Sequence, residues 1–234
     1  RDRHGYSRHL YEFKDEYANM PVDVQKDEEK GLYYVQKEKK RLYFRKSTPA
    51  KKIQKYYRAL SMEQDRRSPH HYFNSVKEVT GKVFVDVGCA EGYSSLEIIE
   101  EAKHVYLFEQ DEQWLEAIRA TFEPWQDKVT IVQKYVSDHN SSREQTLDDF
   151  FNNQTNEHLF LKMDIEGAER HALAGCNNLF QNCQKLDFAI CTYHLRDDEE
   201  VISAFLDKHN CTYINQKGFF RHKIRSVVMR GSKK

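Results

Sequence analysis

The chain contains 234 residues, which is enough for one large domain or for one domain with a smaller appendage. Charged residues make up 32% and hydrophobic residues 39% of it, and its 14 tyrosines and 14 phenylalanines exclude disorder on grounds of composition. The 37 basic and 37 acidic residues balance, so the net charge gives no support for a nucleic-acid partner.

The first 80 residues are polar and irregular, and we interpret them as a small α+β cap rather than an independent domain. Apolar residues at 32–35 and 42–44 flank a polar stretch, which predicts two short strands joined by a turn. We place the domain boundary at residue 80, so that residues 81–234 form the main domain.

A helix is predicted after Pro49, which is favoured in a first helical turn. Ser47 or Thr48 would act as its N-cap. Its apolar residues recur at helical spacing, at Ile53, Tyr56, Tyr57 and Leu60.

From residue 82 onward, predicted strands and helices alternate along the chain. The predicted strands cover residues 82–88, 104–110, 158–164, 185–194, 211–216 and 225–231, and residues 128–138 are predicted to form a further strand and a turn. The predicted helices cover residues 92–102, 111–122, 146–153, 168–180 and 197–209. This alternation predicts a mostly parallel sheet with helices on both faces, and the last two strands, which have no helix between them, should pair antiparallel.

The turn after the first strand of this domain is a candidate ligand site, because parallel sheets bind ligands outside the carboxyl ends of their strands. The strand ends at Asp86, and Gly88 and Gly92 follow. We expect both glycines to let a ligand approach the backbone without interference from a Cβ atom. No Gly-Lys-Ser/Thr follows, which excludes a P-loop, and the three-glycine spacing of nicotinamide sites is missing.

The second strand ends in Glu109, about 20 residues after the glycine turn. An acid at this position typically binds the hydroxyl groups of a ribose, so we expect a ligand that contains ribose.

Acidic residues cluster after the fourth strand of the predicted sheet, and a histidine follows the fifth. Asp164, Glu166 and Glu169 come directly after Lys162. Helix capping and the helix dipole explain some of these acids, but several carboxylates at one crevice also indicate a functional site. His194 ends the fifth strand, where it is placed to act as a general base.

Four motifs in this order resemble those of FkbM-type S-adenosylmethionine-dependent methyltransferases: DVGCAEGYSS, YLFEQD, VSD and FLKMDIEGAE. The resemblance covers roughly residues 81–230, and it implies the seven-stranded class I methyltransferase sheet, a Rossmann-like fold with an antiparallel last strand. The stretch RRSPHHYF also resembles a bacterial subgroup of the family. The usual family form has Ala-Asn before the second glycine, whereas this chain has Ala90-Glu91.

The resemblance implies a set of cofactor contacts for S-adenosylmethionine and its product S-adenosylhomocysteine. Asp86, Gly88 and Gly92 would surround the methionine end and Glu109 would bind the ribose. Asp164 would lie near the transferred methyl group. The remaining implied cofactor residues are Glu91, Tyr93 and Ser94 in the turn, and Gln110, Trp114, Ser137 and Asp138 around the adenine.

The resemblance also implies an oxygen acceptor, which we expect to be a hydroxyl group of a sugar or a glycosylated metabolite. An aliphatic hydroxyl group needs help to lose its proton, and our candidate for the base is His194, with Asp164 as the competitor. Magnesium bound by Asp164 and Glu166 is the alternative. We expect the cap to enclose the substrate through His70, His71 and Tyr72, together with Glu166, although this segment could instead only pack the cap onto the sheet.

Two other function classes stay open at this point: a nicotinamide-dependent oxidoreductase and a binding protein that kept the fold without the chemistry. The sequence contains no apolar run long enough for a membrane span and no signal peptide, so we expect a cytoplasmic protein without a membrane partner. Its five scattered cysteines show no CxxC spacing, which predicts reduced thiols rather than disulfides or a zinc site. The sequence does not predict an oligomeric state.

Overall fold

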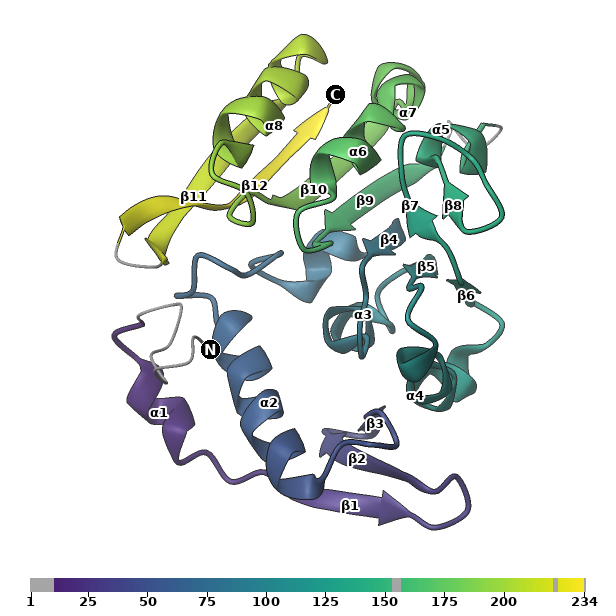
Figure 1. Ribbon diagram of the computed structural model, residues 1–234, viewed down its shortest axis with the longest axis vertical. Helices are drawn as coiled ribbons and strands as arrows, with labels where there is room; N and C mark the ends of the chain where they lie inside the picture. The colour runs from purple at the N-terminus through teal and green to yellow at the C-terminus, as the bar shows by residue number, and fades with distance from the viewer. Residues whose placement is uncertain (1–10, 153–156, 221–222, 234) are drawn as a thin grey trace.

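A seven-stranded sheet runs through the centre of the computed structural model, which describes residues 11–152, 157–220 and 223–233 (Figure 1). The strand order is β11-β12-β10-β9-β4-β5-β6. Neighbouring strands from β10 to β6 pair in parallel, whereas β12 runs antiparallel to both β10 and β11. The strands are β4 (Val83–Val87), β5 (His104–Phe108), β6 (Val129–Val132), β9 (His158–Met163), β10 (Lys185–Cys191), β11 (Thr212–Phe220) and β12 (Lys223–Lys233).

This sheet confirms the predicted fold class, including the antiparallel last strand. From β4 the chain proceeds outward to β5 and β6 and then returns to β9 on the other side of β4. The strand order therefore reverses between β4 and β9, and a crevice at their carboxyl ends is where such sheets bind ligands.

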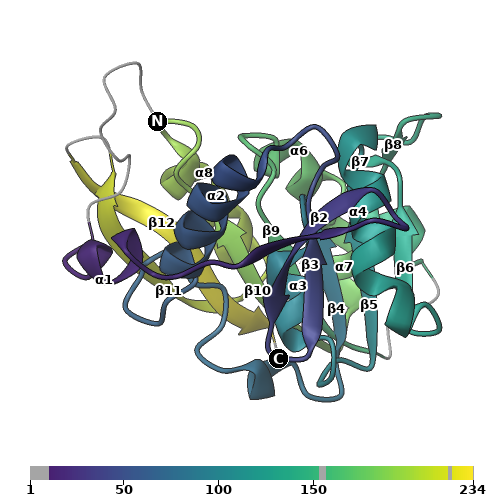
Figure 2. The ribbon, with the colours of Figure 1, turned by 90° about the horizontal axis from the view of Figure 1, so that it is seen from below.

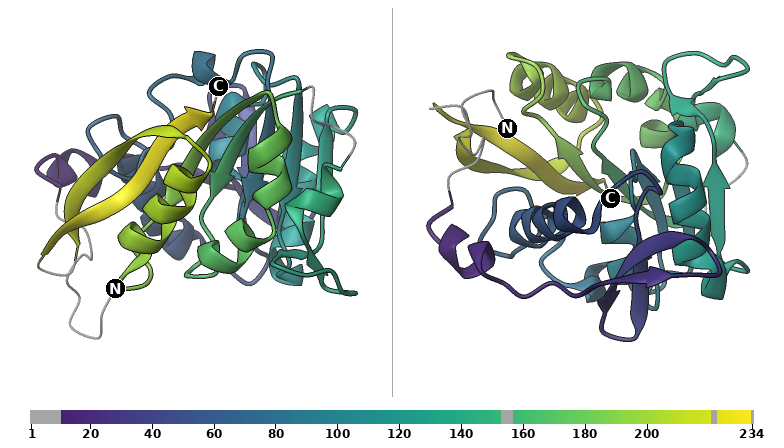
Figure 3. Two further views of the ribbon diagram at one scale, coloured as in Figure 1. Left: turned by 90° about the horizontal axis from the view of Figure 1, so that it is seen from above. Right: turned by 60° about the horizontal axis from the view of Figure 1, so that its bottom comes forward.

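Helices cover both faces of the sheet, as the alternating pattern predicts (Figures 1 and 3). α3 (Tyr93–Ile98) and α4 (Glu112–Phe122) lie on one face, together with the N-terminal elements. The other face carries α5 (Leu147–Phe150), α6 (Glu169–Ala174), α7 (Asn177–Asn182) and α8 (Asp198–Lys208). Within the described residues, no helix is both long enough and apolar enough to cross a membrane.

The single helix predicted for residues 168–180 is wrong, because the chain forms two helices, α6 and α7, that are separated at Gly175. A Cβ atom at Gly175 would lie 2.1 Å from the carbonyl oxygen of Ser137. The backbones therefore approach too closely for a side chain, and the helix ends where this contact forms.

The N-terminal part contains a three-stranded antiparallel sheet of β1 (Val24–Asp27), β2 (Leu32–Lys37) and β3 (Lys40–Tyr43) (Figure 2). The two predicted strands are confirmed as β2 and β3. β1 was not predicted, because only one of its four residues is apolar.

Two helices complete this part, α1 (Lys14–Ala18) and α2 (Ala50–Glu63). The prediction of Ser47 or Thr48 as the N-cap of α2 is wrong. Pro49 occupies the N-cap position, and no side chain caps the helix there. Minor elements elsewhere are a parallel pair, β7 (Tyr135–Val136) with β8 (Glu144–Gln145), and two 3-10 turns, Val76–Val79 and Glu123–Trp125.

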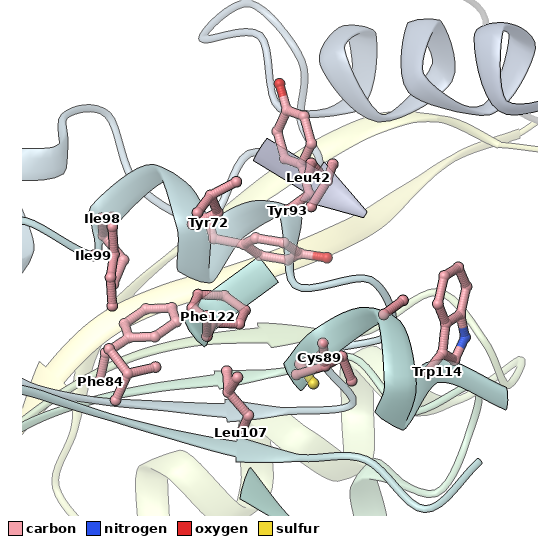
Figure 4. Packing of buried hydrophobic residues seen from close by; sticks show 14 of the residues in the cluster. Leu42, Tyr72, Phe84, Cys89, Tyr93, Ile98, Ile99, Leu107, Trp114 and Phe122 are labelled. Atoms are coloured by element: carbon pink, nitrogen blue, oxygen red, sulfur yellow. The ribbon is translucent and has the colours of Figure 1, made fainter. Parts of the chain in front are cut away.

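The N-terminal elements and the main sheet share one hydrophobic core. Leu42, on β3, belongs to the same buried cluster as Phe84 on β4, Leu107 on β5 and Phe122 on α4 (Figure 4). Val85 on β4 belongs instead to the second cluster, beneath α5–α8. Because the side chains of β4 alternate between the two cores, its carboxyl end is held rigidly at the crevice.

Candidate active site

A cavity of about 1100 Å³ lies at the carboxyl ends of β4, β5, β9 and β10, with α1 and α2 contributing to its wall. Eleven of the predicted site residues line it: Tyr72, Asp86, Gly88, Glu91, Tyr93, Ser94, Glu109, Gln110, Trp114, Asp164 and Glu166. Six do not: His70, His71, Gly92, Ser137, Asp138 and His194. The structure thus collects most of the predicted cofactor residues around one space, and their roles stay predictions.

The two glycines of the first turn are needed for packing within the protein, and our expectation that they let a ligand approach the backbone stays a prediction. Both have φ near +80°. A Cβ atom at Gly88 would lie 2.1 Å from the carbonyl oxygen of Asp164, and one at Gly92 would lie 2.6 Å from the ring of Phe122. The close contact at Gly88 joins the β4 loop to the β9 loop across the crevice.

Glu109 fastens the turn to the end of β5. Its carboxylate accepts hydrogen bonds from the backbone N–H groups of Ala90, at 3.0 Å, and Asp111, at 2.8 Å. Each bond uses a different oxygen. Since a carboxylate has about four acceptor sites, both oxygens keep capacity for a pair of ribose hydroxyl groups.

A buried ion pair lies beneath the turn. Lys162 Nζ is 2.7 Å from Asp86 Oδ1 and also donates a 2.7 Å hydrogen bond to the carbonyl oxygen of Gly88. Burial alone would lower the pKa of Lys162, but Asp86 and Asp164 outweigh it and raise the pKa. Lys162 therefore stays charged, and it fixes Asp86, whose other oxygen accepts a hydrogen bond from Ser95.

Glu91 connects the turn to the N-terminal part. It is buried, and its carboxylate accepts a 2.8 Å hydrogen bond from the hydroxyl group of Tyr56 on α2. Burial raises the pKa of Glu91. The Tyr56 ring stacks on Trp114, with the ring centroids 6.3 Å apart, and Arg45 lies 4.0 Å from the indole ring of Trp114. The wall beside the turn is therefore aromatic.

Asp164 projects from the end of β9 into the cavity, and three other side chains surround it. Tyr72 donates a 2.6 Å hydrogen bond to Asp164 Oδ2. On the other side, His194 Nε2 lies 3.4 Å from Asp164 Oδ1, and His194 Nδ1 lies 2.9 Å from Glu169 Oε1. The predicted meeting of Asp164 with His194 is present, and Glu169 joins them from the start of α6.

His194 lies behind Asp164 rather than in the cavity wall, and its side chain is 7% exposed. Burial alone would lower the pKa of His194, but Glu169 and Asp164 outweigh it and raise the pKa. In this arrangement Asp164 is the group that a molecule in the cavity can contact, and His194 contacts Asp164 from behind.

The two histidines of the cap linker point away from the cavity. His70 is buried against the hydroxyl group of Tyr11, at 3.0 Å from its Nδ1, and burial together with the charge of His194 lowers its pKa to about 3. His71 lies between Asn74 and Arg230, each 3.0 Å from its Nε2. Only Tyr72 of the three predicted cap residues reaches the cavity.

Ser137 and Asp138, the predicted adenine residues, lie next to the cavity wall. The residues that line it are their predecessors, Lys134–Val136. Asp138 instead lies 2.8 Å from His139 Nδ1. Any adenine contact at this end of the cavity would therefore involve Val136 or Tyr135 first.

Sequence analysis missed Glu63, which is the last residue of α2 and lines the cavity. Burial, followed by the charges of Asp164, Glu91 and Glu166, raises its pKa to about 8. The available signal was its position three residues after Leu60, which places an acid on the apolar face of the helix.

The Methyltransferase FkbM domain matches residues 87–214 of the chain. The fold is similar to that of the methyltransferase FkbM from Methylobacillus flagellatus KT, with a TM-score of 0.53 and 17% identity over 74% of this chain and 54% of that chain. This chain thus spans about half the length of that protein.

A second similar structure is the magnesium protoporphyrin IX methyltransferase from Synechocystis PCC 6803 with bound S-adenosylmethionine. Its TM-score is 0.50, with 13% identity over 80% of this chain and 86% of that chain. No curated protein matches the chain. At these identities the two solved structures show the shared fold alone.

Proposed function

The chain belongs to the FkbM family of S-adenosylmethionine-dependent methyltransferases, and we propose that it methylates a hydroxyl oxygen of a sugar or a glycosylated metabolite. The observation that supports this most is that one cavity is lined both by the predicted cofactor residues and by Asp164 and Tyr72. Family membership removes the support for a nicotinamide-dependent oxidoreductase. This proposal also includes a cap that ends at residue 80, a cytoplasmic location, a bacterial origin, and the absence of nucleic-acid and membrane partners.

The residues present fit the methyl donor. The cofactor supplies an activated methyl group on a positively charged sulfur. The wall of the cavity carries the side chains of Glu109 and Asp164, which suit the positively charged methyl donor. Glu109 has acceptor capacity left for ribose hydroxyl groups, and the aromatic wall at Trp114 and Tyr56 suits a planar base.

The acceptor hydroxyl must lose its proton during transfer, and Asp164 is placed to receive it. Tyr72 fixes one Asp164 oxygen by a hydrogen bond, and His194 faces the other. We propose that Asp164 contacts the acceptor and that His194 stabilises the charge of Asp164 and controls its orientation. His194 would thus act as part of the base rather than as a group that touches the acceptor.

The part of the cavity formed by α1 and α2 supports a carbohydrate acceptor. Tyr17, Tyr56, Tyr72 and Tyr193 line the cavity together with Arg58 and Gln64. Aromatic rings pack against the apolar faces of a sugar, and polar side chains pair with its hydroxyl groups. The cavity exceeds the upper end of the usual range for small-molecule sites, about 1000 Å³, which leaves room for a donor and an acceptor together.

The proposal is tested by calorimetry with S-adenosylmethionine and NAD, followed by transfer of a labelled methyl group to a panel of sugars and glycosylated metabolites. We expect binding of S-adenosylmethionine and a product whose methyl group is attached to oxygen by NMR. Transfer to nitrogen or carbon would overturn the oxygen acceptor. Binding without transfer to any panel member would favour a non-catalytic protein, and NAD binding alone would overturn the methyltransferase assignment.

A further inference from the structure

We infer that Asp164, Glu169 and His194 form a binding site for a first-row divalent metal ion such as Mn²⁺ or Zn²⁺. Each of the three side chains offers one ligand atom, and these atoms all lie within 4.8 Å of one another. They come from the β9 loop, the first turn of α6 and the end of β10, so the fold itself assembles the cluster.

Buried atoms without hydrogen bonds distinguish this cluster from an ordinary group of surface acids. Glu169 is fully buried, and its Oε2 has no hydrogen-bond partner among the described residues. His194, whose side chain is only 7% exposed, faces carboxylates with both ring nitrogens, at 2.9 Å from Glu169 Oε1 and 3.4 Å from Asp164 Oδ1. Burying polar atoms without partners is costly, so a missing ligand is the direct explanation.

Two cations close to the cluster along the chain are already engaged. Lys162 is held by Asp86 and by the carbonyl oxygen of Gly88, and Arg170 pairs with Asp197 and Asp198. A proton on His194 would add one positive charge between two carboxylates, whereas a divalent ion would balance both of them and coordinate the imidazole.

The spacing of the ligand atoms fits a bound metal ion, and the donor set favours a transition metal over magnesium. Ligands about 2.0–2.2 Å from an ion lie roughly 3–3.6 Å from each other, close to the 2.9 Å and 3.4 Å separations of the His194 nitrogens from Glu169 and Asp164. Imidazole with carboxylates suits zinc, iron and manganese, while magnesium prefers oxygen ligands alone and keeps several waters. We had expected magnesium bound by Asp164 and Glu166, and we now propose a transition metal instead. Glu169 replaces Glu166 as the second acid, since the Glu166 side chain is 89% exposed.

The site adjoins the cavity at Asp164, so an ion there could bind the acceptor hydroxyl and stabilise negative charge on its oxygen. This chemical role rests on the proposed function, whereas metal binding itself does not.

The test is titration of the metal-free full chain with Mn²⁺, followed by electron paramagnetic resonance, and with Zn²⁺ in a competition experiment. We expect one ion per chain. Glu169→Gln should weaken binding by about tenfold or more, because it keeps the size and the hydrogen bond to the Ile165 N–H but removes a charged ligand. Asp164→Asn should do the same, and the matched control Glu166→Gln should change the affinity by less than about threefold.

Circular dichroism and S-adenosylmethionine affinity of each variant report whether it is folded. The absence of stoichiometric Mn²⁺ and Zn²⁺ binding would overturn the inference, and so would equal losses in Glu169→Gln and Glu166→Gln. Preferential binding of Mg²⁺ would overturn the choice of ion. Metal binding without methylation of any sugar would leave the site standing and refute the proposed function. Methylation that is unaffected by a chelator would leave the proposed function standing and refute the role of the ion in methyl transfer.

Discussion

The two ends of the cavity differ in how well their charges are paired. At the β4 end, Asp86 pairs with Lys162, Glu91 with Tyr56, and Glu109 with two backbone N–H groups. At the β10 end, Glu169 Oε2 has no hydrogen bond within the described residues, and the His194 nitrogens face only the carboxylates of Glu169 and Asp164 in the ion pairs found there. Each acid of the first region thus has a partner within the protein, whereas the second region leaves a buried carboxylate oxygen of Glu169 at the place where we propose that a metal ion binds. Variants at the first end should therefore change stability, and variants at the second end should change chemistry.

The largest effect on stability is expected at the buried ion pair. Lys162→Met leaves Asp86, which is 1% exposed, without its partner, and removal of one partner of a buried pair costs about 3–5 kcal/mol. Urea unfolding measures this loss. The double variant Lys162→Met/Asp86→Asn should recover most of the stability, and a single-variant loss below ~1 kcal/mol would show that the pairing at this end is unimportant.

Gly88→Ala should lower the free energy of unfolding by about 3 kcal/mol, because its Cβ atom would clash with the Asp164 carbonyl oxygen at a positive φ. Gly81→Ala is the matched control, since Gly81 has φ +71° and no atom within 4 Å of an added Cβ. We expect about 1 kcal/mol for this control, from backbone strain alone. Equal losses in thermal unfolding would contradict the close contact between the two loops.

Two variants, one at each end of the cavity, should affect different steps: turnover at the β10 end and cofactor binding at the β4 end. His194→Ala should reduce turnover about 100-fold, within the range for general-base catalysis, while S-adenosylmethionine affinity changes little. Glu109→Ala should weaken cofactor binding about tenfold or more and leave turnover at saturation nearly unchanged. Calorimetry and steady-state kinetics measure both. Collapse of cofactor affinity in His194→Ala with normal turnover would reverse the assignment.

A further expected effect is a pH dependence of stability that arises from Glu63. Its pKa is raised from 4.5 to about 8 in the folded protein, so the folded state binds more protons than the unfolded state between these values. The stability of the ligand-free protein should therefore fall as the pH rises from about 4.5 to 8.

Glu63→Gln should flatten this part of the profile in chemical unfolding. Glu28→Gln serves as the control, because Glu28 is 77% exposed at the surface. If Glu63→Gln and Glu28→Gln give the same profile, Glu63 does not carry the effect.

The sequence alone predicted the sheet, and most of the site residues predicted from it line the cavity. Apolar runs in strands and apolar stripes along helices are local patterns in the sequence. They therefore predicted the mostly parallel sheet, its antiparallel last strand, and the position of Asp86, Glu109 and Asp164 at strand ends. Where the local pattern was weak, as in β1, or was broken by a distant contact, as at Gly175, the prediction failed.

Only the tertiary structure decided which side chains meet. That Glu169 and Asp164 both face His194, that Glu63 reaches the cavity from α2, and that Gly92 packs against Phe122 depend on how separate elements pack. Ser137 and Asp138 lie outside the cavity wall for the same reason. The spacing of residues along a chain fixes the face of an element on which a side chain lies, but the distance between side chains on different elements is set by the packing of those elements in the core.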